Sequence, residues 1–143
     1  MTKSGFTLLE LIVTLIVMGV VASIALPNYA LTVEKSHRRD AETQLLLIHS
    51  AQQMYASRNN GNYWGPAVGA TAELKLANIN QNLGLNILTN GKNYDCILTG
   101  GGASQFACTA TRVGGSGFTV TITQADTDSA GVNPSCAPAA SCP

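Results

Sequence analysis

The chain opens with a long hydrophobic run, continues with a segment of helical periodicity and ends in short segments of alternating polarity. Residues 6–26 contain one charged side chain, Glu10, among residues that are otherwise apolar, small or hydroxyl-bearing. In a helix, 21 such residues extend about 31 Å, which is enough to cross the hydrocarbon core of a bilayer. We therefore predict a membrane-spanning helix over residues 6–26.

The helical pattern does not stop at the end of this run. Side chains that suit one buried stripe recur every three or four residues, at Ala41, Leu45, Ile48, Gln52 and Tyr55. The stretch "NNG" at residues 59–61 is typical of a helix end. We predict one helix over residues 6–58, bent at Pro27 because proline removes a backbone donor.

The remainder of the chain predicts a small antiparallel sheet. Residues 59–92 read as a connecting loop, with turn signals and a short helix over residues 71–79. Three strands are expected within residues 93–124, namely 93–99, 105–113 and 117–124, joined as a meander by glycine-rich turns. In the last strand Phe118, Val120 and Ile122 alternate with threonines, as in a half-buried strand. Residues 125–143 form a tail.

Four cysteines in the last third of the chain predict two disulfides in an oxidising compartment, since a domain this small benefits from covalent links. A zinc site is disfavoured because the chain has no C-x-x-C pair. A hairpin centred on residue 102 places Cys96 opposite Cys108, which leaves Cys136 to pair with Cys142. A tail fastened to the sheet through Cys108–Cys136 or Cys96–Cys142 remains the alternative.

Charge gives little direction to the functional assignment. The chain has eight basic and eight acidic residues, so neither nucleic acid nor acidic substrates are indicated by net charge. The one charge cluster, "EKSHRRDAE" at residues 34–42, is read first as a solvated helix face and second as a set of salt bridges between subunits. Nucleic acid is the least favoured partner, because acidic residues interleave the basic ones and no aromatic residue lies among them. His37 and His49 are expected on the helix surface.

No known catalytic motif occurs in the sequence, and we do not expect an enzyme. The stretch "DTDSAG" at residues 126–131 faintly resembles a calcium loop, but it lacks an oxygen ligand at Ala130 and the closing acid at Ala137. We expect no metal and no cofactor.

The N-terminal stretch "KSGFTLLEL" resembles a type IV prepilin, with the leader ending in Gly5 and with Gly19 and Pro27 further along. The resemblance implies cleavage between Gly5 and Phe6 by prepilin peptidase, methylation of the new Phe6 amine, and assembly roles for Glu10, Gly19 and Pro27. Glu10 would pair with the Phe6 ammonium of a neighbouring subunit, which offsets the cost of a carboxylate in lipid. A carboxylate that merely reaches the membrane interface is the alternative.

The same resemblance implies an α+β pilin fold, in which a long N-terminal helix packs on a small antiparallel sheet. Its parts are a leader (1–5), a helix (6–58) that spans the membrane in its first half, and a globular domain (59–143). A secretory signal peptide cleaved near Ala25 is the competing reading.

Two features of the sequence indicate opposite orientations in the membrane. Lys3 precedes the span, while Lys35, Arg38 and Arg39 follow it, so the positive-inside rule favours a cytoplasmic C-terminal side. The cysteines favour export, and we give them more weight because disulfides do not persist in a reducing cytosol.

The expected function is that of a structural subunit of a type IV pilus. Its partners would be other pilin subunits in a homopolymer, prepilin peptidase and the inner-membrane assembly platform. The subunit would lie in the inner membrane with its globular domain outside the cytoplasm, and later in the extracellular pilus. The alternatives are a minor pilin with a DNA-uptake or adhesion role, and a pseudopilin of type II secretion.

Overall fold

The computed structural model describes residues 6–65, 72–99, 105–115, 117–125, 134–139 and 142. Contacts within the chain divide it into two units, Met1–Val33 and Glu34–Pro143, which are described separately. The glycine turn at residues 100–102 and the calcium-like stretch at residues 126–131 lie outside the described residues.

The first unit contains the beginning of helix α1, which covers Leu8–Arg58 and confirms the predicted long helix. The helix is assigned continuously through Pro27, a position whose side chain lies outside the description. Its most apolar window has a mean hydropathy of 2.5, and none of that window is buried within the chain. By length and composition, this part of α1 is able to cross a membrane.

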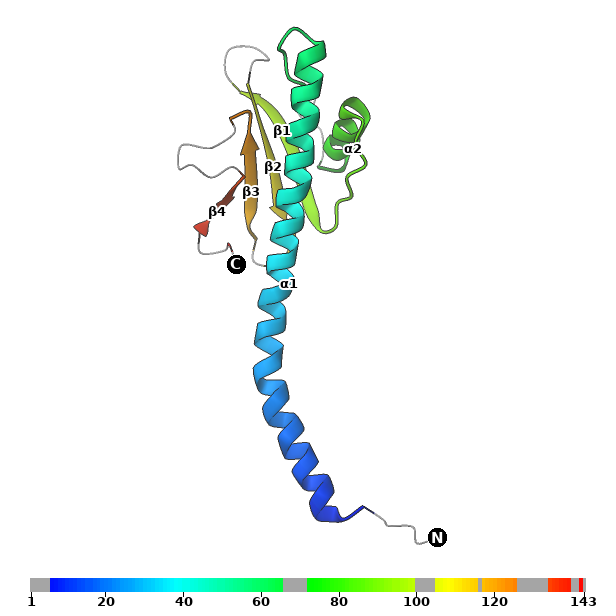
Figure 1. Ribbon diagram of the computed structural model, residues 1–143, viewed down its shortest axis with the longest axis vertical. Coiled ribbons are helices and arrows are strands. Elements are labelled where there is room, and N and C mark those ends of the chain that lie inside the picture. The colour runs from blue at the N-terminus through cyan, green and yellow to red at the C-terminus, as the bar shows by residue number, and fades with distance from the viewer. Residues whose placement is uncertain are drawn as a thin grey trace. The chain divides into compact units, whose positions relative to one another are not determined.

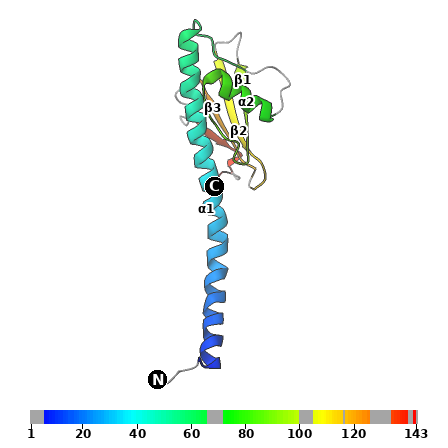
Figure 2. The same cartoon turned by 90° about the vertical axis from the view of Figure 1, so that its right-hand side faces the viewer.

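The second unit is a layer of helix on a layer of sheet (Figures 1 and 2). Ala41, Leu45 and Ile48 of α1 are fully buried in a core shared with the strands, so the predicted stripe faces the sheet. Helix α2, Ala72–Leu83, lies against the first strand and contributes Leu76 and Ile79 to the same core. The expected short helix is therefore present and extends four residues further than its predicted end.

Among the described residues, four strands form one antiparallel sheet: β1 (Lys92–Thr99), β2 (Gln105–Arg112), β3 (Thr119–Thr123) and β4 (Ser135–Ala137). Their spatial order is β1-β2-β3-β4. The first three match the predicted meander, with Phe118, Val120 and Ile122 facing the core.

The predicted count of three strands was wrong, because part of the tail also joins the sheet. Strand β4 pairs with β3 through Val120↔Cys136 and its neighbours. With three residues, β4 is too short to show an alternating pattern in the sequence.

The disulfides follow the pairing that the hairpin argument favoured. Cys96 and Cys108 are opposite each other in the register of β1 and β2, and they are bonded. Cys136 is bonded to Cys142, and both lie against the core. The tail is thus held to the sheet by backbone pairing of β4, while its disulfide stays within the tail.

We expect the two disulfides to differ in their contribution to stability. Replacing Cys96 and Cys108 together by alanine should lower the free energy of unfolding by about 3 kcal/mol, as expected for a loop of this length. The Cys136→Ala, Cys142→Ala double variant should lose less, because the shorter loop restricts the unfolded chain less and opening it releases only the tail. Thermal unfolding measured without reductant on both variants checks the order, and a larger loss in the tail variant would contradict it.

Candidate functional site

The start of α1 carries the residues that the prepilin resemblance singled out. Gly5 lies outside the described residues, while Phe6 is 85% exposed and precedes the helix. The Thr7 hydroxyl accepts a hydrogen bond from the Glu10 backbone nitrogen at 3.3 Å, so Thr7 caps the helix. Thr7 and Glu10 have the spacing of a capping box, and the carboxylate lies at the positive end of the helix dipole. This local role for Glu10 was not foreseen from the sequence.

Within the described chain, Gly19 has no neighbour that requires a glycine. A Cβ atom built there would meet no other heavy atom within 4 Å, apart from the backbone of its own helix. The apolar side chains around it are exposed as well, among them Ile16 at 62% and Val20 at 58%. No contact in the described part of the chain therefore requires residue 19 to be small.

A buried polar network joins α1 to the start of β1. The Lys92 side chain is completely buried, and its Nζ donates to Asp40 Oδ2 at 2.6 Å. The other Asp40 oxygen accepts from Gln44 Nε2 at 3.1 Å, and Gln44 Oε1 accepts from the Tyr94 hydroxyl. Burial, and secondarily the charge of Asp40, raise the pKa of Tyr94 well above its usual value, so its hydroxyl is held as a neutral donor.

A second link joins α1 to the turns at the ends of the strands. Arg112 donates to the Gly91 carbonyl at 3.0 Å and to the Val113 carbonyl at 3.2 Å, and it lies 3.5 Å from a Glu34 carboxylate oxygen. Gly115 has a φ of 63°, and a Cβ there would approach the Glu34 carboxylate to 2.5 Å. A side chain at residue 115 would therefore both strain the backbone and displace Glu34.

The aromatic residues of the connecting segment are packed inward. Trp64 lies against the core, and its backbone N–H and C=O both bond to the buried Gln52 side chain, at 2.9 and 2.7 Å. The Tyr63 ring lies 4.8 Å from Phe106. His49 was expected on the helix surface, but it is half-buried with its ring 5.7 Å from Phe106. The sheet covers this side of the helix, which the sequence pattern alone did not indicate.

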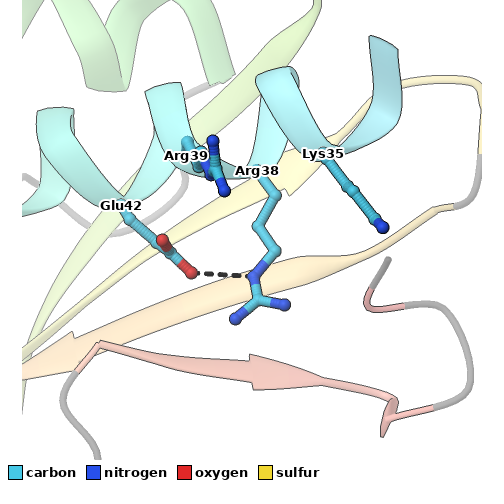
Figure 3. Close-up of a pocket in the computed structure, with 4 residues that line it drawn as sticks. All are labelled: Lys35, Arg38, Arg39 and Glu42. Atoms are coloured by element: carbon cyan, nitrogen blue, oxygen red, sulfur yellow. Dashed lines mark hydrogen bonds and ion pairs between the residues drawn. The ribbon is translucent and has the colours of Figure 1, made fainter. Parts of the chain in front are cut away.

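The charge cluster forms a hollow of about 270 Å³ on α1, lined by Lys35, Arg38, Arg39 and Glu42 (Figure 3). We call it the charged hollow. Arg38 donates to Glu42 at 2.7 Å, as expected for residues four apart on a helix. Lys35 and Arg39 are exposed and form no ion pair with a described residue. Across the described ranges, no group of three His, Cys, Asp or Glu side chains is placed to hold a metal.

Two family models match the chain. Residues 1–26 match the prokaryotic N-terminal methylation motif, which defines the class as pilin-like proteins with this type of N-terminus. Residues 27–137 match the family described as type IV minor pilin ComP, DNA uptake sequence receptor. Because that match covers most of the chain, the protein belongs to this family of type IV minor pilins. Pilins are structural proteins, in agreement with the expectation that the chain is not an enzyme.

Curated relatives match over a much shorter segment. The type II secretion system core protein G of Pectobacterium carotovorum is 41% identical over 58 residues, which are 41% of this chain and 37% of that protein. The type IV major pilin protein PilA of Myxococcus xanthus is 34% identical over 56 residues, or 39% of this chain and 26% of the relative. The matches thus cover well under two thirds of these relatives. No solved structure matches the chain significantly.

Proposed function

We propose that the protein is a minor pilin that enters a type IV filament and acts in DNA uptake. The observation that carries this proposal is the ComP family match over residues 27–137, which includes every described strand of the sheet. This match covers the globular unit, whereas residues 1–26 match only the general N-terminal methylation motif, so it is the more discriminating of the two matches. Adhesion, as the role of such a minor pilin, has no comparable support.

Processing and assembly are proposed on the residues of the N-terminal motif. Prepilin peptidase would cut between Gly5 and Phe6, and Phe6 would then be methylated. The processed subunit would await assembly in the inner membrane with its globular unit outside the cytoplasm, and the assembly platform would then add it to other pilins. Two disulfides in the globular unit support this orientation.

Deletion of the gene tests the proposal. We expect uptake of fluorescently labelled double-stranded DNA to fall at least tenfold while filaments remain visible, since a minor subunit is dispensable for the body of the filament. Wild-type protein should restore uptake, and mass spectrometry should find its N-terminus at Phe6. A Gly5→Leu variant should remain as uncut precursor and fail to restore uptake. Normal uptake in the deletion strain, or restoration by an uncut variant, would contradict the proposal.

A pseudopilin is the second candidate, because relatives from Pectobacterium carotovorum, Aeromonas hydrophila and Escherichia coli are type II secretion system core proteins G. The same deletion strain separates the two functions. If secreted enzymes accumulate in the periplasm while DNA uptake is unaffected, the protein acts in secretion.

A further inference from the structure

We propose that Lys35 and Arg39, at the charged hollow on α1, are the phosphate-binding contacts through which the protein holds double-stranded DNA. This inference rests on the proposed role in DNA uptake and assigns that role to particular residues.

The globular unit has no excess of positive charge with which to attract DNA. Seven basic and seven acidic residues follow residue 33, so the formal charge of Glu34–Pro143 is zero. Contacts to the phosphate backbone supply most of the affinity of non-specific DNA binding. Such contacts must therefore come from a local group of cations rather than from the unit as a whole.

Most of the basic side chains are already engaged in ion pairs within the chain. Lys75 pairs with Asp95 at 2.8 Å, and Lys92 and Arg112 belong to the links described above. Arg38 is bonded to Glu42. Among the described residues from 34 onward, the exposed cations without an ion pair are Lys35, Arg39 and Arg58.

Two of these three cations lie together. Lys35 and Arg39 are four residues apart on α1, about 6 Å along the helix axis, whereas Arg58 lies at the far end of the helix. Like charges at this spacing destabilise a helix slightly, so the pair gains from an anion placed between them. Each strand of a duplex carries one phosphate per about 3.4 Å of its axis, so two long, flexible cationic side chains one helical turn apart can reach phosphates of the same strand.

The surroundings favour a duplex over a single strand. Single-stranded DNA is usually held by exposed aromatic side chains on which bases stack. In the described part of the globular unit, every Phe, Tyr and Trp is buried or half-buried. Figure 3 shows the side chains of Lys35, Arg38 and Arg39 projecting from one stretch of α1, with Arg38 bonded to Glu42. Lys35 and Arg39 are exposed, so a phosphate backbone has access to them.

The test measures the salt dependence of DNA binding by the full, processed chain in nanodiscs of neutral phosphatidylcholine. Fluorescence anisotropy with a labelled duplex gives the affinity between about 50 and 200 mM salt. Replacing Lys35 and Arg39 together by glutamine should reduce the steepness of log K against log salt by about 1.8, or 0.9 for each lost phosphate contact. The affinity gap between wild type and variant should then widen about tenfold from the higher to the lower salt.

Matched variants identify the source of any change. Arg58→Gln removes an exposed cation from the same helix and should leave the salt dependence unchanged, and Lys35→Arg with Arg39→Lys should retain it. If wild type binds DNA and the Lys35, Arg39 double variant binds with the same steepness, this inference fails while the proposed function stands. If wild type does not bind DNA, the proposed function fails as well.

Two other outcomes would overturn the inference by assigning the hollow to another partner. In the first, short-chain phosphatidylglycerol stabilises the wild type but not the double variant, and neither protein binds DNA. The charged hollow would then be a site for lipid phosphate. Loss of the double variant from filaments with unchanged DNA affinity would assign it to contacts between subunits.

Discussion

Replacement of Asp40 by alanine is expected to lower the free energy of unfolding of the globular unit by about 3 kcal/mol, the lower end of the range for a buried ion pair because the Asp40 side chain is itself 38% exposed. The reason is the partner that remains: Lys92 is completely buried, and Asp40 supplies its only carboxylate among the described residues. Without Asp40, the buried ammonium group must stay charged with no carboxylate beside it or lose its proton, and either costs free energy. Gln44 and Tyr94 would lose their anchor in the same step.

Urea unfolding followed by tryptophan fluorescence measures this loss, because Trp64 is the single tryptophan and lies against the core. The matched control is Asp95→Ala, whose partner Lys75 is 24% exposed and is solvated when left alone. This control should cost less than about 1 kcal/mol. The double variant Asp40→Ala, Lys92→Met should recover most of the loss. Equal losses in Asp40→Ala and Asp95→Ala would show that burial of Lys92 does not matter energetically.

The parts of the fold that the sequence predicted correctly depend on local periodicity. The stripe through Ala41, Leu45 and Ile48 repeats at helical spacing, and it is the stripe that the structure buries. The alternation in Phe118, Val120 and Ile122 is equally local. Even the disulfide between β1 and β2 follows from a short-range count, since Cys96 and Cys108 are each six positions from residue 102, where the sequence predicts the turn.

The parts that sequence reasoning missed depend on residues far apart in the chain or on segments too short to show a period. Lys92 and Asp40 are 52 positions apart, and a lysine at the start of a strand is ordinarily solvent-exposed. One signal was available: Lys92, Tyr94 and Cys96 occupy alternate positions on the same face of β1, and that face is buried. Strand β4 offered no such signal.

The N-terminal site was recognisable from the sequence because a motif of adjacent residues carries it. Its purpose is less visible in a single chain, because the proposed partner of Glu10 belongs to another subunit. The hydrogen bond between the Thr7 hydroxyl and the Glu10 backbone suggests a second explanation, namely that the Glu10 carboxylate supports the start of its own helix. A substitution that removes the charge but keeps the cap separates the two explanations.

Glu10→Gln is that substitution, and we expect it to reduce incorporation of the subunit into filaments at least 100-fold. Glutamine at this position of a capping box supports a helix start much as glutamate does. It cannot neutralise the ammonium that the proposed cleavage would create at Phe6 of a neighbouring subunit. When an ion pair lies in an apolar environment, removing the charge of one partner costs about 3–5 kcal/mol. This corresponds to a loss of at least two orders of magnitude in the association constant.

The measurement compares the amount of protein in sheared filaments with the amount left in the membrane, after mass spectrometry has shown that both proteins begin at Phe6. Thr7→Ala is the matched control, because it removes the capping hydroxyl and keeps the carboxylate. It should enter filaments at close to the wild-type level, since the loss of one cap costs only about 1 kcal/mol in a helix that the membrane also stabilises. If Glu10→Gln assembles normally while Thr7→Ala does not, Glu10 supports the start of its own helix. That result would contradict the proposed pairing of Glu10 with a neighbouring subunit.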